Sequence, residues 1–266
     1  MAKGGDAPKR LLAGQDTKLS RTMHDIRYDQ VHDEFILTNP FAEAVLVFAG
    51  NANGNQAPLR IIQGPRTMIT GADRVEVDPI HDEIFIPAAG QVLVFPRTAN
   101  GDVAPIRILK GPDTKLRGGG ASAAVDPVHN LLVVGTGGSA RRGPNGLGSI
   151  LIFNRTDDGN TKPLRMIKGP KSQIIRINQM AVYPPRKFVV ATQPGEGEDM
   201  EPEGVYVGVW SLDDNGDVPP LWRINAGAKS AMKKARGVAI DPKNKELILA
   251  DMRLNAVLTY YFPEMF

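Results

Sequence analysis

The chain has 266 residues, a formal net charge of +3 and no cysteine. Without cysteine, disulfides, thiolate metal sites and cysteine nucleophiles are excluded. No apolar run reaches the length of a membrane span, and residues 1–5 lack the apolar segment of a signal peptide, so the sequence predicts a soluble chain whose compartment is open.

One short segment recurs along the chain and sets its period. Its features are an Asn-Gly or Asp-Gly turn, a strand that begins Pro-x-Arg and a closing glycine, and a degenerate copy opens the sequence at residues 5–14. Repetition at a fixed period is the signature of propellers and other repeat folds. The further copies occupy residues 53–64, 100–111, 158–169 and 215–224.

Each repeat also holds three predicted strands before this segment. In the second repeat they are residues 74–78, 83–86 and 91–95, and the Pro-x-Arg strand at 104–109 is the fourth. Alternating apolar residues between Asp-Pro and Asn-Gly turns are typical of strands joined in hairpins. Four antiparallel strands per repeat make a propeller blade.

The number of repeats predicts the number of blades. The last repeat, residues 236–266, stops after its third strand, and residues 7–12 supply a fourth. The sequence therefore predicts a single all-β domain over residues 1–266, a β-propeller of five four-stranded blades closed by the N-terminal strand completing the last blade, with six blades as the alternative. In such a blade the aromatic stretch 254–266 is expected to be mainly buried. The first strands end at Asp29, Asp78, Asp126, Tyr183 and Asp241.

Two repeats carry insertions, which we expect between their second and third strands. The first loop, residues 135–149, is basic and glycine-rich, and the second, residues 192–204, is acidic and rich in glycine and proline. Long loops on a rigid scaffold commonly carry recognition. The charged residues predicted to contact a partner are Arg141, Arg142, Glu196, Glu198, Asp199 and Glu201.

The motifs of the repeat also carry a family resemblance. A unit of the form D-P-x-x-x-E-I-x-V, a third strand of the A-V-L-V-F type and the connection A-N-G-D-x-x-P-I-R-x-I-x-G resemble the NHL-repeat propellers of bacteria, and more distantly the senescence-marker and gluconolactonase-like propellers. The resemblance covers nearly the whole chain and implies a propeller with a funnel along its axis. Proteins resembling this one are often exported, which implies an extracytoplasmic location if the natural chain is longer.

Candidate site residues are expected where the repeats differ, because packing dictates the residues that they share. In a propeller, the loop leading into each first strand lines the axial opening, and convergent polar groups in a concave site suit a small ligand. The predicted ligand-binding ring consists of the polar residues five and four positions before the end of each first strand. They are His24, Asp73, Asn178 and Arg236 at the first position, and Asp25, Arg74, Ser122 and Gln179 at the second.

Other repeated polar residues are expected to be structural. His32, His81 and His129 occupy the same turn in successive repeats, so they are too far apart to share one metal ion. The arginines of the Pro-x-Arg strands are expected to pair with neighbouring acids. No metal site and no cofactor is therefore expected. These arginines are Arg10, Arg60, Arg107, Arg165 and Arg223.

The sequence favours a non-catalytic binding or interaction module that uses its axial face and the two loops for a protein or small-molecule partner. One alternative is a metal-assisted hydrolase, lactonase or lyase at the axial opening, where His24, Asp25 and Asp73 would supply acid/base or cation-binding groups. Against it, the ring lacks the Glu that the gluconolactonase-like relatives place there. The other alternative is a module that binds single-stranded RNA on its basic axial face. Against that, the loops are poor in aromatic residues and share the face with the acidic loop.

Overall fold

A computed structural model describes residues 6–21, 23–71, 73–88, 90–117, 122–137, 147–195 and 204–266. The chain forms two compact units, Met1–Ile86 with Val94–Ile106 and Pro87–Leu93 with Arg107–Phe266. Within the described residues the regular structure consists of β-strands and short 3₁₀ turns. None of the helices in these residues has the length and apolar character required to cross a membrane.

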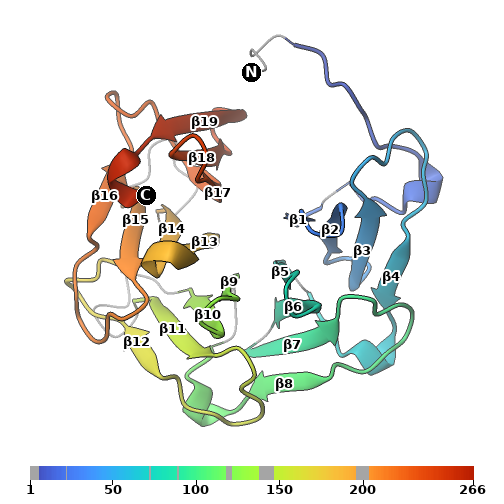
Figure 1. The fold of residues 1–266 in the computed structure, drawn as a ribbon, viewed down its shortest axis with the longest axis horizontal. Coiled ribbons are helices and arrows are strands. Elements are labelled where there is room, and N and C mark those ends of the chain that lie inside the picture. The colour runs from blue at the N-terminus through green and yellow to red at the C-terminus, as the bar shows by residue number, and fades with distance from the viewer. Residues whose placement is uncertain are drawn as a thin grey trace. The chain divides into compact units, whose positions relative to one another are not determined.

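The strands form five antiparallel sheets that follow one another along the chain (Figure 1). This confirms the fold class predicted from the sequence, an all-β propeller with five blades. The first sheet contains β1 (Asp25–Asp29), β2 (Glu34–Asn39), β3 (Ala44–Ala49) and β4 (Arg60–Gln63), and the second contains β5 (Glu76–Asp78), β6 (Glu83–Ala88), β7 (Gln91–Pro96) and β8 (Arg107–Lys110). The third contains β9 (Ser122–Asp126), β10 (Leu131–Thr136), β11 (Ser149–Asn154) and β12 (Arg165–Ile167).

The fourth and fifth sheets belong to the second unit. The fourth contains β13 (Met180–Tyr183), β14 (Phe188–Pro194), β15 (Val205–Ser211) and β16 (Trp222–Asn225), and the fifth contains β17 (Ala235–Asp241), β18 (Glu246–Asp251) and β19 (Ala256–Tyr261). The 3₁₀ turns are η1 (Gln15–Thr17), η2 (Pro65–Thr67), η3 (Pro112–Thr114), η6 (Pro184–Arg186) and η7 (Pro263–Met265). Both insertions fall between second and third strands along the chain, as predicted, but residues 135–136, 149 and 192–194 of the predicted loops belong to the strands themselves.

In each of the first three sheets, an Asp and a His stabilise the turn that follows the first strand. In the first sheet, Asp29 Oδ1 accepts hydrogen bonds from the backbone N–H groups of Val31 at 2.9 Å and His32 at 3.0 Å, and Asp29 Oδ2 lies 2.8 Å from His32 Nδ1. The same contacts recur between Asp78 and His81 and between Asp126 and His129. The structural role predicted for these histidines is confirmed.

Two of the repeated arginines, Arg60 and Arg165, contact nearby protein groups. Arg60 makes a two-point ion pair with Glu34, with Nη1–Oε1 and Nη2–Oε2 distances of 2.9 and 2.6 Å, and Arg97 Nη1 lies 2.9 Å from Glu34 Oε2. Burial alone would raise the pKa of Glu34, but the hydrogen bonds and charges of the two arginines lower it below its ordinary value. Elsewhere, Arg165 Nε donates to the Leu212 carbonyl at 2.6 Å.

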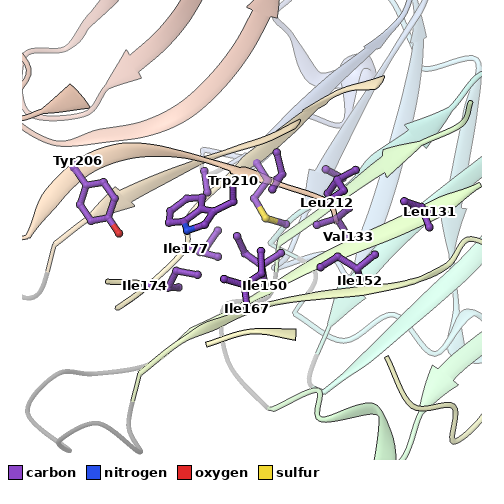
Figure 2. Close-up of a cluster of buried hydrophobic side chains, with 14 residues drawn as sticks. Leu131, Val133, Ile150, Ile152, Ile167, Ile174, Ile177, Tyr206, Trp210 and Leu212 are labelled. Carbon is purple, nitrogen blue, oxygen red and sulfur yellow. The ribbon is translucent and has the colours of Figure 1, made fainter. Parts of the chain in front are cut away.

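The core of the second unit lies between successive sheets. Trp210 of β15 is fully buried with Ile150 of β11 and Ile177, and Figure 2 shows these side chains directed toward one another. In this unit β9 contacts β13, and β13 and β14 contact β17, so the first strands of neighbouring sheets lie next to each other. Residues on the loops before these strands are thereby brought close to the neighbouring sheet.

In the described part of the chain, the last sheet of the second unit holds β17, β18 and β19. Residues 7–12, predicted to close the propeller, belong to the first unit, where Gly54 N donates to the Leu11 carbonyl at 2.8 Å. The expected burial of residues 254–266 is wrong for β19, since Val257 and Tyr261 are 70% and 71% exposed. The physical reason is that no described strand covers the outer edge of β19.

Candidate binding site beside the first and second blades

Two residues of the predicted ring form an accessible ion pair in the first unit. His24 directly precedes β1, and Asp73 lies shortly before β5. Their Nδ1 and Oδ1 atoms are 2.7 Å apart, and the side chains are 32% and 47% exposed. Since Asp73 accepts the bond at Nδ1, this contact leaves the other imidazole nitrogen, Nε2, outside the pair. The pair is both oriented and open to solvent.

Arg74 and Thr38 fix the backbone beside this pair. Arg74 Nη1 donates to the carbonyl oxygens of Asp73 at 2.8 Å and His24 at 3.4 Å, and Thr38 Oγ1 donates to the Asp73 carbonyl at 3.4 Å. The guanidinium of this ring residue is thus used for local backbone contacts. Its effect is to hold the two loops that carry His24 and Asp73 together.

An exposed aromatic ring adjoins the pair. Phe41, in the turn between β2 and β3, is 78% exposed and packs edge-on against His24, with ring centroids 6.3 Å apart at 79°. An exposed aromatic surface beside polar groups offers a ligand both apolar contact and hydrogen bonds. Phe41 is not apparent from the sequence, because unrelated residues occupy its position in the other repeats.

Two other ring residues bind the neighbouring sheet. Asp25 Oδ2 accepts the backbone N–H of Val75 at 3.1 Å in the first unit, and Gln179 Oε1 accepts that of Val238 at 2.6 Å in the second. Both side chains belong to residues that are buried. Val75 and Val238 occupy the same repeat position, three residues before the end of a first strand. These two predicted ligand contacts therefore serve packing between sheets.

The remaining ring residues lie in the second unit. Thr192 Oγ1 donates to the carbonyl oxygens of Arg236 at 2.9 Å and Gln179 at 3.2 Å, and the buried Asn178 donates its backbone N–H to the Thr192 carbonyl at 3.0 Å. Ser122 is fully buried on β9. Three of the predicted residues thus meet around a threonine that the sequence analysis missed.

The shared role of Thr192 and Thr38 could have been detected from their positions in the sequence. Each stands nine positions after the end of its first strand, and each belongs to a sheet with an acceptor side chain, Gln179 or Asp25, four positions before that end. In both sheets the threonine contacts the carbonyl of the residue five positions before the next strand end. Comparing these two repeats with the others would have revealed a two-point contact between sheets.

The predicted loop residues Arg141, Arg142, Glu196, Glu198, Asp199 and Glu201 lie outside the described residues. Among the described residues, no three His, Asp or Glu side chains are grouped so that they could hold a metal ion. His24 and Asp73 provide two such groups, oriented toward each other.

No protein-family model matches the chain, and no curated protein sequence matches it.

Proposed function

We propose that the chain is a binding module that takes a protein or small-molecule partner at His24, Asp73 and Phe41, on a scaffold of the NHL-repeat type. The observation that carries this proposal is a difference in burial and contacts among the ring residues. Asp25 and Gln179 are buried in contacts between sheets, whereas His24 and Asp73 are exposed and oriented by a 2.7 Å bond. Conformations fixed before binding reduce the entropy that a complex must offset.

The chemistry of this surface defines the ligand class. The Asp73 carboxylate accepts hydrogen bonds, His24 Nε2 accepts or donates one according to its protonation, and Phe41 supplies an apolar face. The complementary ligand carries hydroxyl or amine groups next to an apolar patch. Sugars, lactones and protein segments with polar and apolar side chains meet this description.

A thermal-shift screen of the full chain against sugars, lactones, divalent cations and short oligonucleotides tests the proposal. A ligand that binds only the folded state raises the melting temperature by mass action. The shift should disappear in His24→Gln and Asp73→Asn. It should persist in His32→Gln, which removes a histidine of similar exposure, 28% against 32%, that pairs with a different acid. A shift that survives both site substitutions would overturn the proposed site.

The same pair favours a second candidate, a hydrolase that opens a lactone or ester. An imidazole oriented by a carboxylate is the arrangement that a general base uses to activate water. This candidate would be supported over simple binding if the wild type turns over a lactone and His24→Gln lowers the rate by about 10²-fold or more, the loss expected for a missing general base. Turnover that His24→Gln leaves unchanged would exclude it.

A further inference from the structure

Three of the repeat turns in the described residues contain an Asn-Gly pair. Asparagine is a chemically labile side chain, and a following glycine has no side chain to hinder attack by its own backbone nitrogen. The asparagine of each pair is exposed, so water reaches all three turns. The pairs are Asn53-Gly54, Asn100-Gly101 and Asn215-Gly216.

In each of these turns, one backbone partner holds the two groups that would react. Gly216 N donates to the Met166 carbonyl at 2.8 Å, and Asn215 Oδ1 accepts the N–H of Met166 at 3.0 Å. We call a turn with these two contacts docked. The same contacts join residues 100–101 to Ile61 and residues 53–54 to Leu11.

The residue after the glycine anchors each turn a second time, in a backbone cradle that we define as a segment Gly-x-x-Ser/Thr. In the cradle 169–172, Asp217 Oδ1 accepts the backbone N–H groups of Lys171 at 2.7 Å and Ser172 at 3.0 Å. A Cβ atom added to Gly169 would collide with the Asp217 carboxylate. Asn55, Asp102 and Asn160 are held by the cradles 14–17, 64–67 and 111–114 in the same way.

Deamidation of an Asn-Gly pair requires both of the held groups to move. The glycine nitrogen loses its proton and attacks the Asn Cγ, a succinimide ring closes through the new N–Cγ bond, and the side-chain nitrogen leaves as ammonia with that proton. Water then opens the ring. Opening at Cγ gives aspartate, and opening at the backbone carbonyl gives isoaspartate, in which the chain continues through Cγ. Because docking fixes the glycine N–H and the Asn side chain, the turn has to leave its partner before it reacts.

The third sheet shows which product fits a docked turn. There Asp158 stands in place of the asparagine, and its Oδ1 accepts the N–H of Ile108 at 2.8 Å, while Gly159 N donates to the Ile108 carbonyl at 2.9 Å. An aspartate formed by deamidation therefore docks as Asp158 does. An isoaspartate does not, because its carboxylate is attached directly to Cα and an extra carbon enters the backbone before the glycine.

We propose that Asn53, Asn100 and Asn215 are deamidation sites whose reaction is prevented while their turns are docked. A turn that leaves its backbone partner reacts, the aspartate product docks again, and the isoaspartate product leaves the turn permanently undocked. Each of these contacts lies within one compact unit. The proposal is independent of the function proposed for His24 and Asp73.

Peptide mapping of the full chain by mass spectrometry, with samples kept at pH 8 and taken over several days, tests the proposal. The amounts of aspartate and isoaspartate are measured at the three positions. In the folded chain each asparagine should react at least about tenfold more slowly than in the same chain in urea, since two hydrogen bonds have to open first. Equal rates in the two conditions, or no reaction in urea, would overturn the proposal.

Two cradle variants, at positions remote in sequence from the asparagines, serve as controls for each other. Gly64→Ala places a methyl against Asp102 and should accelerate the reaction of Asn100 alone by about tenfold. Gly169→Ala, against Asp217, should do the same for Asn215 alone. Acceleration of all three asparagines in either variant would show that the reaction requires unfolding of the whole chain and would overturn the proposal, as would unchanged rates in both variants.

Asn53→Asp tests whether the aspartate product docks again. Its turn then reads Asp-Gly-Asn, as at residues 158–160. The melting temperature should stay close to that of the wild type. A melting temperature as low as that of Gly64→Ala would overturn this part of the proposal.

Discussion

Replacing Glu76 by Gln is expected to remove much of the pH dependence of stability between pH 5 and pH 8. Glu76 lies on β5 with only 14% of its side chain exposed, and its Oε2 is 3.3 Å from Arg27 Nε. Burial raises its pKa from 4.5 to about 7, although the charge of Arg27 acts in the opposite direction. The folded protein therefore holds a proton that the unfolded chain has released.

The sign and size of the effect follow from this linkage. Because the pKa of Glu76 is raised on folding, its contribution to stability is fully present below about pH 4.5 and is lost as the pH rises through 7. A change in pKa from 4.5 to about 7 corresponds to about 3 kcal/mol. For a chain of this size, such a loss lowers the melting temperature by roughly 10 °C.

Thermal unfolding followed by circular dichroism at pH 5, 6, 7 and 8 measures this effect. The wild type should lose stability across the range, and Glu76→Gln should lose clearly less, with the two curves converging at pH 5. Glu264→Gln serves as the control at an exposed carboxyl. Parallel curves for wild type and Glu76→Gln would refute the assignment of this pH dependence to Glu76.

Three further predictions concern the stability of the fold, and the first two compare equivalent positions of different repeats. Gly169→Ala should lower the urea midpoint more than Gly227→Ala, because both share a φ of 139° but only at Gly169 would the added methyl meet a carboxylate, that of Asp217, in the described residues; equal losses would contradict a cost from this contact. Asp78→Ala should reduce the free energy of unfolding by about 3 kcal/mol, since it removes three hydrogen bonds from a buried carboxylate, and Asp241→Ala, at a half-buried residue, should cost less in the same urea titration. Glu34→Gln should lower the melting temperature at pH 7, and this difference from the wild type should disappear as the pH falls below 4. The reason is that the pKa of Glu34 is lowered on folding, so its carboxylate stabilises the folded protein at high pH and not in acid. A constant difference in melting temperature from pH 7 to pH 3 would contradict it.

The strands could be predicted from the sequence because turn residues and alternation repeat five times. One local difference is at β5, predicted from residue 74 and observed from Glu76. Its first residues bind the neighbouring sheet instead of β6, since Val75 N donates to Asp25 and Val75 O accepts from Arg27. A single-sequence pattern contains no information on which partner strand a backbone group will choose.

The candidate site could be predicted in part. The proximity of His24 and Asp73 follows from their equal positions in adjacent repeats, and the structure brings them into contact. The roles of Asp25 and Gln179 could not be read in this way, because a polar side chain at the start of a strand either faces a cavity or accepts a neighbouring backbone N–H. The paired threonines, Thr38 and Thr192, were the only sequence signal that separates these two cases.

The contact between a turn and the cradle before it has a consequence for how such a chain evolves. Four such cradles, the Gly-x-x-Ser/Thr segments 14–17, 64–67, 111–114 and 169–172, each hold the Asn or Asp of the turn in the next repeat, so either residue fills a cradle. Duplication or loss of one whole repeat in the gene therefore leaves each remaining turn with a matching cradle. The number of blades is free to change without a new interface having to arise.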